Sequence, residues 1–170
     1  EAFAARVLRD ALKLSALSAA CAVAEGALAE REPHQPVFEG LLALLGSFEH
    51  DDWPSAYVKW ELGLLGEVGF ALDLSECAST GQNDQLAYVS PKSGRAVSLA
   101  AGEPYKDKLL ALPQFLLYPG EGGSAADVLE GLKLTGYFLA KNVFQHAGKG
   151  LPASRDRLTE RLRTKPVDHT

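Results

Sequence analysis

The chain of 170 residues has no methionine, only two cysteines and no long apolar run. The two thiols, Cys21 and Cys77, are too few for the disulfide framework of a small secreted protein, and they fit reduced thiols in the cytosol. No apolar segment approaches the roughly 20 residues that a membrane-spanning helix needs, and no segment has the pattern of a signal peptide. These absences favour a cytoplasmic protein with an ordinary hydrophobic core.

Positive charge is also scarce over most of the chain. The net charge is −5, and the first 140 residues carry 10 basic and 19 acidic side chains. Residues 141–170 reverse this balance, with 7 basic and 3 acidic side chains. Because binding to phosphate backbones depends on clustered lysine and arginine, the composition argues against autonomous nucleic-acid binding outside this last segment.

No motif for catalysis is present. The histidines have no serine, cysteine or carboxylate at a recognisable spacing, and the chain has no phosphate-binding loop and no nucleophile elbow. These histidines are His34, His50, His146 and His169. We therefore expect a protein that is not an enzyme and that has no cofactor.

Helical periodicity is the strongest pattern that the chain does show. Residues 3–30 carry apolar side chains at helical spacing, with a break at Asp10 as an alternative. A second helix is expected over 36–48, and a third follows with Asp51 or Asp52 as its cap. These three helices can form antiparallel neighbours joined by short connections.

The third helix contains three glycines spaced three residues apart. Its apolar face, which should be buried, consists of Tyr57, Trp60, Leu64, Leu65 and Val68. Gly63 and Gly66 should each cost about 1 kcal/mol relative to alanine in a helix interior, so we expect another part of the chain to pack closely against them. Gly69 is a natural helix stop.

The pattern changes after this helix. Two short strands are predicted within 86–98, and the surrounding segment 77–99 is interpreted as a small β-hairpin insert. A long helix follows with Ser124 as its N-cap and Asp127 three residues later, and a last helix begins after Pro152. The sequence therefore predicts a mainly α fold, a helical bundle with a small β-hairpin insert.

Residues 57–81 read YVKWELGLLGEVGFALDLSECASTG. This order of a basic residue, an aromatic, Glu-Leu, a Leu-Leu-Gly-x-x-Gly-aromatic run and a Cys-x-x-Thr-Gly turn resembles the helical domain of the bacterial recombination mediator family RecO. Three further segments follow in the order of that family: YVSPKSGRAVS at 88–98, GEPYKDKLLALPQFL at 102–116 and GKGLPASRDRL at 148–158. Their order across nearly the whole chain argues against chance similarity.

The resemblance implies a three-part protein with an N-terminal OB barrel that binds nucleic acid, a helical domain and, in many members, a small zinc-binding insert. No stretch alternates apolar and polar residues over enough strands to form the barrel. Because the chain also begins at Glu1 and lacks methionine, we expect a fragment without that barrel. We interpret 1–170 as a single RecO-like C-terminal helical domain with the insert at 77–99.

Zinc binding is not expected in this insert. Relatives of this type use two Cys-x-x-Cys pairs, whereas this chain keeps only Cys77, with Thr80 in the place of the second thiol and no thiol or imidazole over 94–98. Structural zinc needs four such ligands. The insert is therefore interpreted as a degenerate, metal-free relative of a zinc finger, with Cys77 as a small buried apolar side chain.

The resemblance also implies recognition of the acidic, aromatic-ended C-terminal tail of single-stranded DNA-binding protein, and cooperation with the partner RecR. Such a tail needs a cation for its carboxylates beside an apolar pocket for its terminal ring. Two clusters offer this combination, Lys59 with Tyr57 and Trp60, and Lys106 and Lys108 with Tyr105. In the family pattern, the basic residue at the place of Lys59 lies near the peptide groove. The alternative is that these lysines are ordinary solvated charges.

The last helix is rich in arginine, with Arg155, Arg157, Arg161 and Arg163. The pair Ser154-Arg155 resembles a Ser-Arg pair of the family. Three interpretations stay open: Ser154 caps the helix while Arg155 bridges to the body of the domain, the arginines extend a DNA path from the missing barrel, or they form a general interaction surface.

Taken with the resemblance, these residues predict a non-enzymatic DNA repair and recombination mediator in the bacterial cytoplasm, associated with the nucleoid. The full protein would capture the tail of single-stranded DNA-binding protein, cooperate with RecR, support RecA loading and anneal complementary strands. DNA would bind mainly through the missing OB domain. The alternative is a helical domain that contacts DNA through its arginine-rich C-terminal helix.

Overall fold

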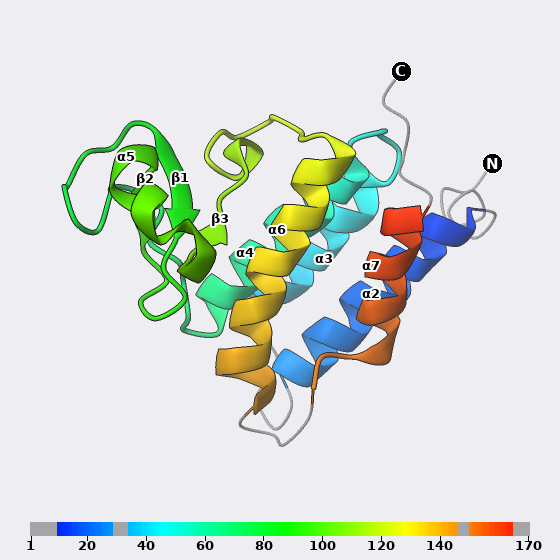
Figure 1. The fold of residues 1–170 in the computed structure, drawn as a ribbon. Coiled ribbons are helices and arrows are strands. Elements are labelled where there is room, and N and C mark those ends of the chain that lie inside the picture. Colours follow the sequence, from blue (N-terminus) through cyan, green and yellow to red (C-terminus); the bar gives the residue numbers. More distant parts are fainter. Residues whose placement is uncertain (1–9, 29–33, 146–149, 165–170) are drawn as a thin grey trace.

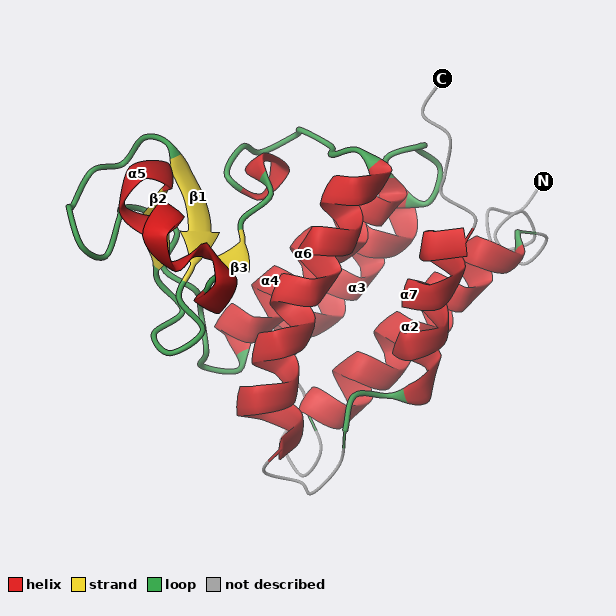
Figure 2. Ribbon diagram, viewed as in Figure 1, coloured by secondary structure: helices red, strands yellow, loops and turns green. Residues whose placement is uncertain are grey.

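Helical periodicity in the sequence corresponds to a helical body with a small sheet at one side (Figures 1 and 2). The computed structural model describes residues 10–28, 34–145 and 150–164. Within these residues no helix is long and apolar enough to cross a membrane. The α-helices are α2 (Ala11–Ala27), α3 (Gln35–Ser47), α4 (Trp53–Glu67), α5 (Leu99–Gly102), α6 (Ala125–Phe138) and α7 (Ala153–Thr164). The mainly α fold with a small β insert is confirmed.

The start of α2 is set by a side-chain cap. Oδ1 of Asp10 accepts hydrogen bonds from the backbone N–H groups of Leu12 at 3.0 Å and Lys13 at 3.2 Å. These N–H groups lie in the first turn and have no partner within the helix. The helix expected over 3–30 therefore breaks at Asp10, and its remaining parts, 3–9 and 29–30, lie outside the described residues.

The end of α4 is set by a glycine. Gly69 has a φ of 98°, a left-handed conformation that glycine adopts without steric cost. The N–H of Phe70 donates to the carbonyl oxygen of Leu65 at 2.8 Å, and the N–H of Gly69 donates to that of Gly66 at 3.2 Å. This pair of bonds is a Schellman motif, so the predicted stop at Gly69 is confirmed. At the other end Asp52 is the N-cap residue, without a side-chain hydrogen bond.

The order in which the helices pack differs from the expectation of three sequential neighbours. α3 does pack against α4, but α2 packs mainly along α7, and α4 also packs on α6. Figure 1 shows α2 and α7 side by side and running in opposite directions. The buried face of α2 includes Ala16, Ala19 and Ala20, and such small side chains allow two helices to approach closely.

The insert is an antiparallel sheet with the strand order β2-β1-β3. Its strands are β1 (Leu86–Val89), β2 (Ala96–Ser98) and β3 (Leu110–Ala111). The hairpin expected over 86–98 is confirmed. β3 was not predicted, because a strand of two residues is too short to show a periodic pattern. It follows a 3-10 segment, η1 (Glu103–Lys108).

The sheet is fastened to the helical body by packing and by polar contacts. One buried apolar cluster joins residues of the insert to residues of α4 and α6, including Cys77, Leu86, Val89, Ala96, Leu65, Leu134 and Phe138. Nζ of Lys141 donates to the carbonyl oxygen of Pro91 at 2.8 Å, from the π-helical segment η3 (Leu139–Phe144) to the hairpin turn. A second buried cluster holds α2, α4, α6 and α7 together.

The N-terminus of α6 has the predicted cap. Oγ of Ser124 accepts from the N–H of Asp127 at 3.1 Å, and Oδ2 of Asp127 accepts from the N–H of Ser124 at 3.1 Å. This capping box satisfies two N–H groups that the helix itself leaves unpaired. It also fixes where the preceding loop, residues 118–123, joins the helix.

Candidate partner-binding groove

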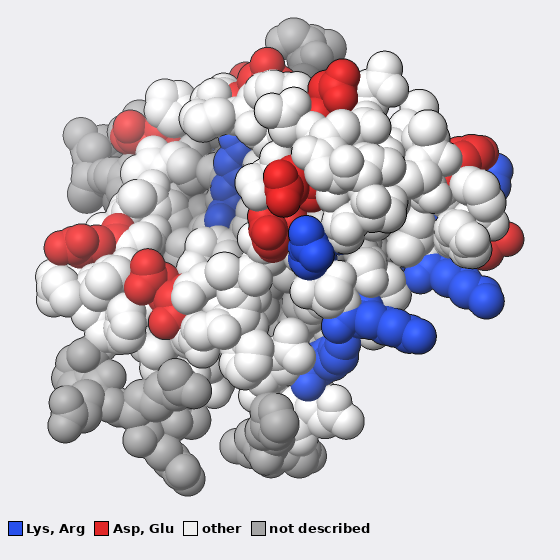
Figure 3. All heavy atoms as spheres, turned by 90° about the vertical axis from the view of Figure 1, so that its left-hand side faces the viewer, with Lys and Arg blue, Asp and Glu red and all other residues white. Residues whose placement is uncertain are grey.

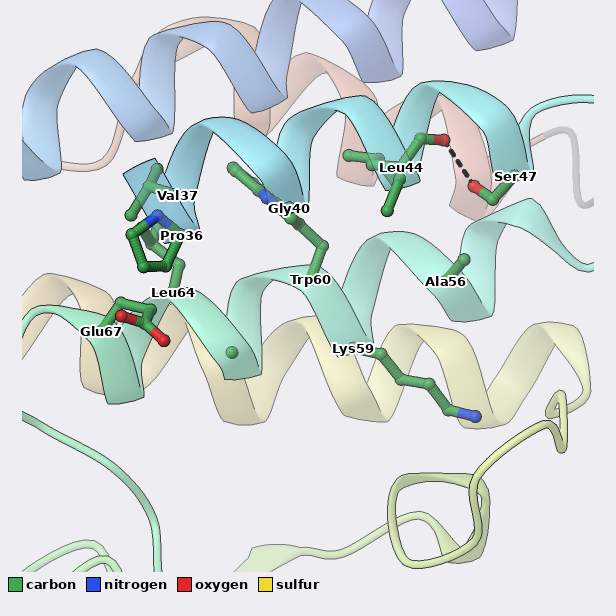
Figure 4. Close-up of a pocket in the computed structure, with 12 residues that line it drawn as sticks. Pro36, Val37, Gly40, Leu44, Ser47, Ala56, Lys59, Trp60, Leu64 and Glu67 are labelled. Carbon is green, nitrogen blue, oxygen red and sulfur yellow. Dashed lines mark hydrogen bonds between the residues drawn. The ribbon is translucent and has the colours of Figure 1, made fainter. Parts of the chain in front are cut away.

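An apolar groove of about 390 Å³ lies between α3 and α4 (Figure 4). It is lined by Pro36, Val37, Gly40, Ala43, Leu44, Ser47, Ala56, Lys59, Trp60, Gly63, Leu64 and Glu67. The lining includes one cation, at Lys59, and one anion, at Glu67. The first predicted peptide cluster therefore contributes two of its residues, Lys59 and Trp60, to a concave apolar surface.

Small residues on both helices line the groove, Gly40 and Ala43 on α3 and Ala56 and Gly63 on α4. A Cβ added to Gly40 would meet the ring of Trp60 at 3.5 Å, and one added to Gly63 would meet nothing within 4 Å. At Gly66 the nearest atom would be the Cβ of Ala71, at an ordinary contact distance of 3.7 Å. The expectation that another segment packs closely against Gly63 and Gly66 is therefore wrong, and at Gly63 the open space belongs to the groove.

Lys59 lies at the flank of the groove and is engaged by the loop that precedes α6. Its Nζ donates to the carbonyl oxygens of Glu121 at 2.6 Å and Tyr118 at 3.3 Å, and it lies 5.9 Å from the ring centroid of Phe115. Figure 4 shows the side chain extending away from α3 toward this loop. An ammonium group has three N–H donors, so one remains for a ligand.

The same loop has a second attachment to α4 one helical turn earlier. The N–H of Gly123 donates to Oγ of Ser55 at 2.9 Å. Ser55 and Lys59 are four residues apart and therefore lie on the same face of the helix. Together they hold the loop 118–123 against α4, with the ammonium of Lys59 directed toward the loop (Figure 4).

Tyr57 does not take part in the groove. Its side chain is fully buried, and its hydroxyl donates to Oε2 of Glu61 at 3.0 Å. Burial, and then the negative charge of Glu61, raise the pKa of Tyr57 well above its usual value. The prediction that Tyr57 contacts a peptide is corrected, because a residue on the buried stripe of α4 presents no surface to a ligand.

The second predicted peptide cluster lies on η1, beside the sheet. Tyr105 is 62% exposed, and Nζ of Lys106 pairs with Oε1 of Glu103 at 3.2 Å. Lys108 is also exposed. On the face that carries the sheet, several basic side chains project at the lower right, while other basic side chains lie directly beside acidic ones (Figure 3). The two clusters thus sit on different elements, and only the cluster on α4 adjoins the groove.

Arg155 forms a buried ion pair with Glu61, which joins α7 to α4. Nε of Arg155 lies 2.7 Å from Oε2 of Glu61, and Nη2 donates to Oε1 at 2.8 Å. Oγ1 of Thr135 on α6 also donates to Oε1, at 2.7 Å. Glu61 is 0% exposed and Arg155 is 4% exposed. Burial lowers the pKa of Arg155, but the carboxylate of Glu61 outweighs this and the pKa is raised.

This ion pair agrees with the interpretation that Arg155 bridges to the body of the domain, and it removes Arg155 from the predicted DNA surface. The partner of Arg155, Glu61, was not predicted from the sequence, although a signal was present. Glu61 is a charged residue on the apolar face of α4, four residues after Tyr57 and four before Leu65, and a carboxylate there requires a buried cation. The proposed cap by Ser154 is wrong, because α7 begins at Ala153 and Oγ of Ser154 has no hydrogen-bond partner.

Comparison with known proteins gives the family. The family model described as "Recombination protein O C terminal" matches residues 8–151. This chain belongs to the RecO family. Proteins named DNA repair protein RecO are similar to it: that of Rhodospirillum centenum is 53% identical over 164 residues, 95% of this chain, and that of Phenylobacterium zucineum is 54% identical over 159 residues, 93% of this chain.

The chain spans 65% of the length of each of these two RecO proteins. The same share holds for the RecO of Rhodospirillum rubrum, which is 51% identical over 164 residues and 92% of this chain. No solved structure matches the chain. The expected family is therefore confirmed from sequence relatives.

In this RecO chain the insert is organised around a single buried thiol. Sγ of Cys77 accepts from the N–H of Ser98 at 3.2 Å and lies 3.5 Å from Oγ of Ser79. Burial raises the pKa of Cys77, but hydrogen bonds from Ser79, Thr80 and Ser98 oppose it and lower the pKa to about 5. Cys77 is 1% exposed, which confirms that its side chain is buried. Among the described residues, no three His, Cys, Asp or Glu side chains are grouped to hold a metal ion.

Proposed function

We propose that this RecO-family chain captures the acidic, aromatic-ended C-terminal tail of single-stranded DNA-binding protein in the groove between α3 and α4. The observation that supports this proposal is Lys59, a half-buried lysine that lines an apolar groove of about 390 Å³. A carboxylate needs such a cation, and a terminal aromatic ring needs such a groove. The family to which the chain belongs agrees with a role in DNA repair.

The electrostatics of Lys59 suit a carboxylate that arrives from solvent. Two of its donors hold backbone carbonyls of the loop 118–123, so the ammonium is already fixed in position before a ligand binds. A fixed cation loses less conformational entropy on binding than a free lysine would. Lysine offers a point charge and no bidentate fork, so we expect modest affinity.

In the complete protein, this capture would cooperate with the remaining part of the polypeptide. We propose that the protein acts without catalysis as a recombination mediator, which displaces single-stranded DNA-binding protein, cooperates with RecR, supports RecA loading and anneals strands. DNA would bind mainly through an OB domain. The share of the present chain would be partner capture and scaffolding.

The proposal can be tested by fluorescence anisotropy of a labelled acidic peptide that ends in phenylalanine. We expect saturable binding to the wild-type chain and at least about tenfold weaker binding to Lys59→Glu, because the charge that meets the carboxylate is reversed. Lys133→Glu, on the exposed side of α6, is the matched control and should bind like wild type. If Lys106→Glu weakens binding instead, the peptide site lies on η1.

A second candidate function is DNA contact through α7. Arg157, Arg161 and Arg163 are exposed on this helix, although Nη1 of Arg163 pairs with Oε2 of Glu160 at 2.6 Å. The hollow between α6 and α7 has side chains of both signs, such as Lys133 and Glu130, which does not favour phosphate. Binding of a labelled single-stranded oligonucleotide that falls steeply with salt, without peptide binding, would support this alternative.

A further inference from the structure

We propose that a row of lysines along the exposed side of α6 and the adjoining hairpin turn binds the phosphate backbone of single-stranded nucleic acid. This row, the lysine surface, consists of Lys133, Lys141, Lys92 and Lys108, and it includes the ring of Tyr137, a residue that is 39% exposed. The inference does not depend on peptide capture between α3 and α4, and it places nucleic acid on elements other than α7.

The fold brings together lysines that are far apart in the sequence. Nζ of Lys141 donates to the carbonyl oxygen of Pro91 at 2.8 Å, so η3 lies against the hairpin turn that carries Lys92. Lys108 lies just before β3, and the antiparallel pairing of β3 with β1 directs it to the same end of the sheet. Three segments of the chain therefore place their lysines around one hairpin turn.

The row continues along α6 with an aromatic ring between two lysines. Lys133, Tyr137 and Lys141 follow at intervals of four residues and therefore share one side of the helix. Nζ of Lys141 lies 5.8 Å from the ring centroid of Tyr137, so these two side chains are neighbours. From Lys133 to Lys141 the helix axis advances by about 12 Å. Proteins hold single strands with such alternation, because cations bind the phosphates and bases stack on the ring.

The ammonium groups of the lysine surface can meet an incoming anion. Among the residues that the structure describes, none of the four lysines forms an ion pair with a carboxylate, whereas Lys106 pairs with Glu103 at 3.2 Å. Lys141 uses one of its three N–H donors within the protein, so two remain. Figure 3 shows several basic side chains projecting at the lower right of the face that carries the sheet. Glu130, three residues before Lys133, marks the acidic end of the row.

A net charge of −5 is compatible with a local cationic surface. The composition argues against nucleic-acid binding by residues 1–140, but a count along the chain takes no account of where the fold places each charge. At an ionic strength of about 0.1 M, exposed charges more than about 10 Å apart are largely screened, so a bound strand responds chiefly to the lysines beneath it. With four phosphate contacts, we expect weak binding that falls steeply with salt.

Fluorescence anisotropy of a labelled oligothymidylate measures this binding when the complete chain is titrated at several salt concentrations. Each contact with a phosphate of a single strand contributes about −0.7 to the slope of log K against log salt, so four lysines predict a slope of about −3. Binding should therefore weaken about fiftyfold between about 50 and 200 mM salt.

The lysines are then changed one at a time, as Lys92→Glu, Lys108→Glu and Lys133→Glu. Lys141 stays in place because it also fastens the hairpin turn. Each variant should bind at least about fivefold more weakly at about 0.1 M salt, with a slope that is less steep by about 0.7, because one set of counterions is no longer released. Arg157→Glu is the matched control, since it makes the same charge change at an exposed position of α7 and should bind like wild type.

The aromatic ring is tested separately by Tyr137→Leu, which keeps an apolar side chain and removes the stacking surface. We expect binding to weaken about fivefold or more with an unchanged salt slope, because stacking releases no counterions. Tyr105→Leu is the matched control, since Tyr105 is 62% exposed on η1 and outside the lysine surface. Circular dichroism of every variant checks that the fold is intact.

Four results would overturn the inference. Wild type may not bind oligothymidylate at about 50 mM salt, or Arg157→Glu weakens binding as much as the lysine variants do, which assigns nucleic acid to α7. The lysine variants bind oligothymidylate like wild type but lose the acidic peptide, which assigns the surface to an acidic protein partner. Tyr137→Leu binds like wild type, so the ring holds no base. Peptide capture stands or falls separately, with the titration of wild type and Lys59→Glu.

Discussion

The two sides of α4 differ in how completely their residues are buried and bonded. The face toward α6 and α7 is closed, with Tyr57, Glu61 and Leu65 fully or almost fully buried and every polar group of the first two engaged. Another side of α4 is open, where Lys59 and Gly63 line an unfilled groove. The comparison teaches that one helix can divide its residues between stability and binding.

The expected loss of stability on substitution differs between the two faces accordingly. An unpaired carboxylate at the position of Glu61 would be buried without solvent, and breaking a buried ion pair by removing one partner typically costs about 3–5 kcal/mol. At an exposed position of the open face, such as Gly63, a substitution changes no buried contact, and surface substitutions usually change stability by no more than about 0.5 kcal/mol. The change in the free energy of unfolding should therefore be large for substitutions on the closed face and small for exposed positions on the open face.

The largest effect is expected for Arg155→Met, which breaks the closed face. It leaves Glu61 without its cation, so the free energy of unfolding should fall by about 3–5 kcal/mol. Chemical denaturation followed by circular dichroism measures this change. Arg157→Met is the matched control, because Arg157 is exposed on the same helix. A loss below about 1 kcal/mol for Arg155→Met would contradict the role given to the ion pair.

A medium effect is expected for Tyr57→Phe, which removes one hydrogen bond to Glu61 and leaves the ion pair. The cost should be about 1–2 kcal/mol at neutral pH. Burial first, and the charge of Glu61 next, raise the pKa of Tyr57 in the folded state. This stabilisation is complete below pH of about 10, the unfolded value, and is lost as the pH rises through the higher folded pKa.

Denaturation at a series of pH values checks that sign. The difference in unfolding free energy between wild type and Tyr57→Phe should be constant at neutral pH and should narrow above pH of about 10. If this difference in unfolding free energy widens above pH of about 10 instead, the folded protein does not hold the phenol of Tyr57 in its neutral form.

The smallest effect is expected for Lys59→Met, which acts on the open face. It removes the two hydrogen bonds to the loop 118–123, so amide hydrogen exchange in this loop should become faster. Global stability should change by less than about 1 kcal/mol, because the lysine is only half-buried. Ser55→Ala is a useful comparison, since it removes the other attachment of the same loop. Unchanged exchange in both variants would argue against the attachment.

Much of the fold could be predicted from local sequence signals. Asp10, Gly69 and Ser124 act through groups within a few residues of themselves, so the helix ends that they set follow from the sequence alone. The hairpin over 86–98 follows from its turn residues for the same reason. The pairing of α2 with α7 depends on distant segments, and no local pattern carries that information.

The candidate site shows the same difference between features that local sequence predicts and features that depend on distant segments. The sequence and its family resemblance pointed to Lys59 and Trp60. The same helical periodicity placed Tyr57 on the face that should be buried, and the structure confirms this burial, which conflicts with the peptide contact also predicted for Tyr57. Gly63 was expected to be covered, because a glycine in a helix usually marks a close contact. Whether the space above a glycine is filled depends on the neighbouring helix, here α3, and so on the tertiary structure.

The ion pair between Glu61 and Arg155 also sets an order of events during protein synthesis. Its partners are separated by 94 residues, so at about 5–20 residues per second the arginine leaves the ribosome on the order of ten seconds after the glutamate. Until then the Glu61 carboxylate has no cation to pair with, so we expect the closed face of α4 to stay in contact with water. The nascent chain would complete its core only after α7 has been synthesised. The docking of α7 would then be the step that commits the domain to its folded state.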